Sequence, residues 1–108
     1  MKKILLLVTS LFLFSACGEN VYDKTISVFD DATEQIVAVK DKEELRQVNR
    51  KLNAEYSALL REHSEEFAEL RQKALDGDKK VERQFEKVKE AKRLYRKAKK
   101  NKLDELRD

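Results

Sequence analysis

The sequence predicts an all-α protein, a small antiparallel three-helix bundle of unequal helices. Charged residues make up 42% of the 108-residue chain and hydrophobic residues 41%, a balance typical of long amphipathic helices. Beyond residue 20, apolar residues recur at steps of three and four, and no two-residue alternation typical of strands persists. A single cysteine excludes an internal disulfide, so helix packing must stabilise the fold. The alternative is a bent, extended helix or coiled coil that oligomerises.

The first 16 residues have the pattern of an export signal. Lys2 and Lys3 are followed by an apolar run over residues 4–14, and the run ends at the small residues Ser15 and Ala16. A transmembrane helix needs roughly 20 apolar residues, so this run is too short to span a bilayer. The sequence therefore predicts an exported protein whose signal is removed.

The signal ends in the only cysteine of the chain. The stretch Phe14-Ser15-Ala16-Cys17 resembles the lipobox of bacterial lipoprotein precursors, which usually carry leucine at the position of Phe14. The resemblance covers residues 1–18. It implies cleavage between Ala16 and Cys17, with diacylglyceryl and N-acyl lipid on Cys17 and no other cofactor. One acyl chain binds membranes only weakly, so several chains would give stable anchoring.

Other fates of this junction stay open at the level of sequence. Ordinary secretory cleavage after Ala16, or one residue later, would release a soluble protein, and an unlipidated Cys17 would be a thiol able to pair between chains. In bacteria with two membranes, the lipoprotein resemblance also bears on location, because an aspartate after the cysteine retains the protein in the inner membrane. Gly18 stands there, which implies the outer membrane, facing the periplasm.

After a lipidated tether over residues 17–20, the helical domain is expected over residues 21–108, with its first helix at about 21–39. Acidic side chains take the opposite face of this helix, and the apolar phase breaks near Val39. Asp41 is a suitable N-cap for the next helix, and Glu44 can reach back to complete a capping box. The apolar stripe of the first helix comprises Tyr22, Ile26, Phe29, Ala32, Ile36 and Val39.

The second helix is expected at about residues 42–75, as the longest and most regular of the three. Its apolar positions repeat every eleven residues, a period that keeps the seam nearly straight and predicts a partner helix. His63 lies within the stripe, so we assign it a structural role and no catalysis or metal. The stripe comprises Leu45, Val48, Leu52, Tyr56, Leu59, His63, Phe67, Leu70 and Ala74. In this arrangement the middle helix is central, covered at its start by the first helix and at its end by the third.

The third helix is expected at about residues 79–102, after a turn at Asp76-Gly77-Asp78. Because the apolar stripe continues in phase across Gly77, one unbroken helix is the alternative. Twelve Lys and Arg face three Glu in this segment, whereas the first helix is acidic. The opposite charges favour placing the first and third helices side by side, although single surface pairs contribute little.

Two rows of cations at four-residue spacing predict a positive ridge on the third helix. Such a ridge suits an anionic partner, such as phosphate-bearing lipid headgroups, cell-wall polymer or an acidic protein surface. A merely solvated face is the alternative, and nucleic acid is not expected for an exported protein. The candidate anion-binding residues are Lys89, Lys92, Arg93, Arg96, Lys97 and Lys100.

The sequence contains no arrangement typical of an active site. Glycine-rich loops, Ser/His or Cys/His pairs and metal-ligand clusters are all missing from it, so we expect no enzyme, metal or catalytic cofactor. The expected function is a membrane-anchored envelope lipoprotein whose coiled-coil-like helical module serves structural or protein-interaction roles, with self-association or an envelope protein as partner. The alternative is a binding or inhibitory lipoprotein that uses the basic ridge on an anionic ligand or enzyme.

Overall fold

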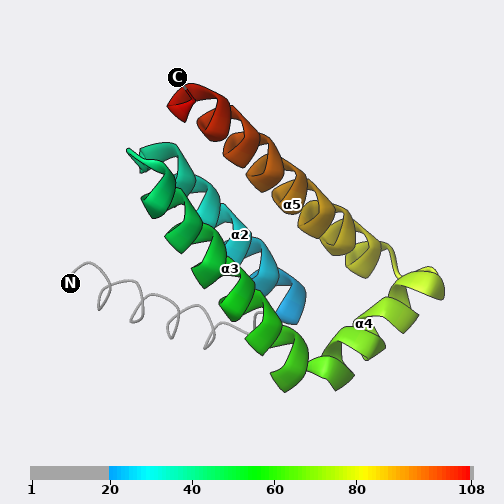
Figure 1. Ribbon diagram of the computed structural model, residues 1–108. Helices are drawn as coiled ribbons and strands as arrows, with labels where there is room; N and C mark the ends of the chain where they lie inside the picture. The colour runs from blue at the N-terminus through cyan, green and yellow to red at the C-terminus, as the bar shows by residue number, and fades with distance from the viewer. Residues whose placement is uncertain (1–19, 108) are drawn as a thin grey trace.

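The computed structural model describes residues 20–107, and all secondary structure in this range is α-helical. The prediction of an all-α protein is therefore confirmed. The chain folds back on itself as a helical bundle, with extents of 49 × 30 × 20 Å, rather than as one extended helix. Its four helices are α2 (Val21–Ala38), α3 (Lys42–Glu62), α4 (Ser64–Leu75) and α5 (Lys79–Leu106) (Figure 1).

Three helices lie along one another, and α4 crosses one end of the bundle (Figure 1). The α2 and α5 helices run in the same direction, since Asn20 bonds Gln84 and the Phe29 and Tyr95 rings lie 6.1 Å apart. The α3 helix runs antiparallel to both. The turn between α2 and α3 lies near the C-terminus, at the end of the bundle opposite α4.

The central helix is α2, not the middle segment that the sequence favoured. Both α3 and α5 pack mainly on α2, and they barely contact each other. The burial of each helix reflects this arrangement. The α2 helix buries six of its 18 residues, all but Thr25 hydrophobic, whereas α3 buries two of 21. A helix with one narrow stripe can pack against one partner, but α2 is apolar over enough of its surface to pack against two.

The expected helix over residues 42–75 is broken at His63, so the described chain has four helices instead of three. His63 leaves helical geometry at φ −123° and ψ 30°. Helix lengths explain the break. A straight helix of this length would extend about 50 Å, whereas the 18-residue α2 covers only about 27 Å. The bend returns Phe67 and Leu70 to the bundle, where they pack against the other helices.

The ends of the other helices also differ from the sequence prediction. Asn20, assigned to the tether, is the N-cap of α2 and forms a capping box with Asp23. At its other end, α5 continues to Leu106 rather than stopping near residue 102. Lys102 is almost fully buried and Leu106 packs against the core, so the last turn of α5 is held by packing.

The two turns follow local sequence signals. Asp41 caps α3 by accepting a bond from the Glu44 amide at 2.8 Å, while the Glu44 carboxylate accepts from Lys40. Gly77 has φ +96°, and the amides of Gly77 and Asp78 donate to the carbonyls of Ala74 and Lys73. This is a Schellman ending, in which glycine is favoured because its left-handed φ costs other residues energy. The structure thus has the predicted turn and not one unbroken helix.

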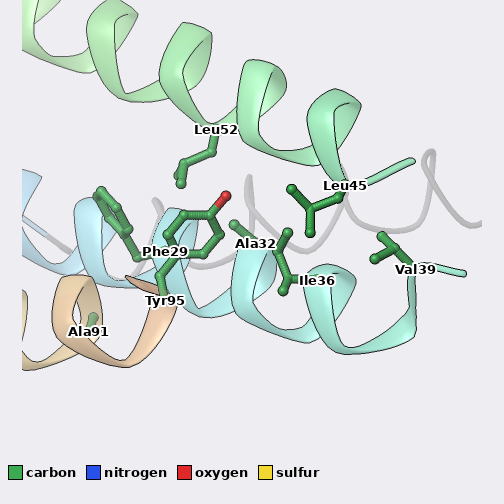
Figure 2. Close-up of a cluster of buried hydrophobic side chains, with 8 residues drawn as sticks. All are labelled: Phe29, Ala32, Ile36, Val39, Leu45, Leu52, Ala91 and Tyr95. Atoms are coloured by element: carbon green, nitrogen blue, oxygen red, sulfur yellow. The ribbon is translucent and has the colours of Figure 1, made fainter. Parts of the chain in front are cut away.

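Two adjacent hydrophobic clusters form the core. Figure 2 shows the larger one, in which side chains of α3 and α5 meet α2 from different sides. It consists of Phe29, Ala32, Ile36, Val39, Leu45, Leu52, Ala91 and Tyr95. The smaller cluster lies at the α4 end and consists of Val21, Tyr22, Leu70, Val81 and Val88.

Candidate functional site

The predicted lipidation and cleavage residues, Ala16 and Cys17, lie outside the described residues. The nearest described residue, Asn20, belongs to a polar network at the start of α2. Its side-chain amide donates to Gln84 Oε1 at 2.8 Å, and Gln84 Nε2 donates to Asp23 at 3.2 Å. The Val21 amide donates to Glu66 Oε2 at 2.9 Å. Bonds to α4 and α5 therefore fix the point at which the chain enters the bundle.

Five of the six predicted ridge cations lie exposed along the outer face of α5. At 100° per residue, Lys89, Arg93, Arg96, Lys97 and Lys100 occupy neighbouring positions around the helix. Lys92 does not join them. Its Nζ donates to the Tyr56 hydroxyl at 2.6 Å and lies 4.6 Å from the centre of that ring, so it ties α5 to α3.

Two of the exposed cations form ion pairs with carboxylates of α5. Lys89 lies 3.0 Å from Glu86, and Arg93 makes two hydrogen bonds to Glu90, at 3.0 and 2.6 Å. The Arg93 hydrogen bonds hold the pKa of Glu90 below its usual value. Among the described residues, no carboxylate lies within 4 Å of the remaining three ridge cations. These unpaired cations are Arg96, Lys97 and Lys100.

The acidic face of α2 does not neutralise the ridge. All ion pairs among residues 20–107 join side chains three residues apart in the sequence, so none links α2 to α5. Burial, and then the charges of Glu34 and Asp30, raise the pKa of Asp31, while Lys51 of α3 opposes the shift. Acidic side chains of α2 therefore repel one another around Asp31, and the cation that opposes this repulsion belongs to α3, not to α5.

His63 marks the bend between α3 and α4. Its Nδ1 lies 3.7 Å from Glu66 Oε1, and three further glutamates surround the same shallow hollow. No group of three or more His, Cys, Asp or Glu side chains within the described range is placed to hold a metal ion. The position of His63 is explained by the bend itself.

Sequence reasoning missed a groove between α4 and α5 at the end of the bundle that contains the start of α2. It has a volume of about 570 Å³ and an apolar floor, flanked by charged side chains. Leu75 is 73% exposed, and Phe85 is 38% exposed because its ring lies at the groove, 5.8 Å from the Tyr22 ring. The only signal in the sequence was Leu75, which lies off the apolar stripe. The groove is lined by Tyr22, Arg71, Ala74, Leu75, Glu82, Arg83, Phe85 and Glu86.

Comparison of the chain with protein-family models, curated proteins and solved structures finds no match. Within the described residues, none of the helices is both long and apolar enough to cross a bilayer. Functional inference must therefore use the chemistry of the chain itself.

Proposed function

We propose that the protein is a bacterial envelope lipoprotein, held at the membrane by lipid on Cys17, whose helical module serves a structural or protein-interaction role. In a bacterium with two membranes, Gly18 favours the outer one, with the module facing the periplasm. The observation that carries the proposal is the signal pattern of residues 1–17, which ends in the only cysteine of the chain.

The architecture of the module agrees with this role. The described helices α2, α3 and α5 lie along one another, with α3 antiparallel to the other two, and α4 crosses the end of the bundle at which α2 begins. Exposed apolar side chains lie along the bundle, with Val37 63% and Leu94 42% exposed. Such side chains, together with a charged surface, suit protein contacts, and we assign the module no catalytic activity.

Metabolic labelling with a clickable fatty acid tests the anchor directly. Wild type is expected to take up label and sediment with membranes, whereas Cys17→Ala should lose both properties, because residue 17 is the only thiol available for lipidation. Cys17→Ser is a closer steric control with the same expected loss. An unlabelled, soluble wild type would contradict the lipoprotein proposal.

A second candidate function is binding of an anionic ligand or acidic protein by the ridge on α5. The observation that favours it is the group of three exposed cations without carboxylate partners in the described part of the chain, Arg96, Lys97 and Lys100. Exchanging all three for Gln should weaken binding to an anionic matrix and lower the salt needed for elution. Exchange of the paired residues Lys89 and Arg93 is the matched control and should have a smaller effect. Equal effects of the two exchanges would argue against a specific ridge.

A further inference from the structure

We propose that the groove between α4 and α5 lies against the membrane surface, with Arg71 and Arg83 on anionic phospholipid headgroups and Leu75 at the apolar boundary. This inference rests on the lipid anchor proposed for Cys17. It adds an orientation: the bundle stands on the end formed by α4 and the start of α5, and the unpaired ridge cations Arg96, Lys97 and Lys100 lie farther along α5, away from the lipid.

The point at which the chain enters the bundle lies close to Cys17 in the sequence. Asn20 is fixed by its bonds to Asp23 and Gln84, and only Gly18 and Glu19 separate it from Cys17. An extended chain spans at most about 3.5 Å per residue, so Asn20 lies within about 10 Å of the lipidated residue. The groove adjoins this point, because its lining residue Tyr22 follows Asn20 by two residues, and Arg83 and Phe85 flank Gln84 in the chain.

The groove combines an apolar floor with two arginines that have no carboxylate partner in the described range. Its two carboxylates already have partners, since Glu82 lies 3.7 Å from Lys79 and Glu86 lies 3.0 Å from Lys89. Neither Arg71 nor Arg83 has a carboxylate within 4 Å in the described range, and both are exposed. Two unpaired guanidinium groups beside an apolar floor match a lipid interface, where phosphates adjoin hydrocarbon.

The groove and the unpaired cations of the ridge lie at different levels along α5. Gln84 marks the level of Asn20, and at 1.5 Å per residue Arg96 and Lys100 lie about 18 and 24 Å farther along α5. These distances exceed two Debye lengths at physiological salt, each about 8 Å. The acidic hollow at the α3–α4 bend also adjoins the start of α2, because Glu66 accepts from the Val21 amide; it repels an anionic surface, so the proposed orientation turns the hollow away from the lipid.

Tryptophan fluorescence tests the orientation, because the chain contains no natural tryptophan. The full-length precursor is expressed, and the lipidated Leu75→Trp protein is reconstituted into vesicles of phosphatidylcholine and phosphatidylglycerol that contain brominated lipid. Val37→Trp is the matched control, since Val37 is similarly exposed but lies 17 residues, about 25 Å, along α2 from Asn20. Brominated lipid should quench the fluorescence of L75W, and contact with the lipid should shift its emission to the blue. Neither the intensity nor the wavelength of V37W should change.

A second pair of variants tests the cations. Arg71→Gln with Arg83→Gln, in the L75W protein, should lower the ratio of docked to free groove about 30-fold, because each cation at an anionic surface contributes about 1 kcal/mol. Arg96→Gln with Lys100→Gln removes the same charge from the ridge and should leave quenching unchanged. An equal loss with both pairs would overturn the proposed orientation.

Vesicle flotation separates failure of the anchor from failure of the orientation. Protein that does not float with vesicles overturns both the anchor and this inference. Protein that floats while L75W resists quenching overturns the orientation alone. If its emission is blue-shifted but unquenched, the groove is covered by a second copy or another protein instead of lipid, which also overturns the inference.

Discussion

Replacement of Ile36 by alanine should remove a large fraction of the protein's free energy of unfolding. Ile36 is fully buried, at 0% exposure, in the larger core cluster between α2 and α3. Burial of this kind makes Ile→Ala cost about 2–5 kcal/mol, through lost transfer energy and the remaining cavity. A domain of this size has a total stability of about 4–13 kcal/mol. If the free energy of unfolding falls by about 1 kcal/mol per M of urea, the urea concentration at the unfolding midpoint should fall by about 2 M or more.

Val37→Ala provides the matched control for this prediction. Val37 is the next residue of the same helix but is 63% exposed, so its truncation removes little packing. Alanine also has the higher helix propensity, by about 0.5 kcal/mol, which should leave the midpoint unchanged or slightly raised. Both variants of residues 18–108 are measured by urea unfolding with circular dichroism at 222 nm. Equal shifts for the two variants would refute the placement of α2 in the core.

Three further predictions concern single groups. Burial and nearby acids raise the pKa of Asp31, so ionisation of Asp31 destabilises the folded state relative to the unfolded chain at neutral pH. Asp31→Asn should therefore raise the free energy of unfolding at pH 7. Urea unfolding should show that this gain vanishes below about pH 4, where the carboxyl is protonated in both states. Gly77→Ala should lower the free energy of unfolding by about 1–2 kcal/mol and lower the thermal midpoint accordingly, because the φ of +96° strains any residue with a Cβ even though no atom crowds the site. An unchanged midpoint would contradict the left-handed turn. Tyr95→Phe should lower the free energy of unfolding by about 1 kcal/mol, since the buried hydroxyl donates to Asn49 Oδ1 at 2.8 Å; a neutral result in urea unfolding would contradict that bond.

Features encoded within a few residues could be predicted from the sequence. The stripe of α2 is an example, since Tyr22, Phe29 and Ile36 are buried as its spacing requires. The same holds for the α3 N-cap at Asp41 and the turn at Gly77, where local hydrogen bonds determine the geometry. At the cap and the turn the deciding hydrogen bonds lie within five residues along the chain, and in α2 the apolar spacing itself marks the face that is buried.

Features that depend on how helices meet could not be predicted in this way. The eleven-residue repeat is regular across His63, and nothing local requires a bend there. The bend follows from the shortness of α2, which leaves the second half of the repeat without a partner unless it turns. Phe85 lies eleven residues after Ala74, in phase with the apolar repeat, yet it is 38% exposed, because α4 crosses the end of the bundle instead of running beside α5. The groove is a consequence of the same bend, so no pattern within one helix could have revealed it.

The charge of α5 shows why a count of cations overstates the capacity of a helix to bind anions. Twelve Lys and Arg between residues 79 and 102 suggest one continuous positive surface, yet the fold assigns these side chains different roles. Lys92 donates to Tyr56, and Lys102 is almost fully buried beside Glu105, at 3.3 Å. Lys89 and Arg93 are paired along the helix. Recognition of an anion must therefore depend on the cations that packing leaves unpaired, and these lie at two separate levels of the bundle: beside the start of α2, and about 20 Å farther along α5. A ligand that contacts both levels would therefore have to extend about 20 Å along α5.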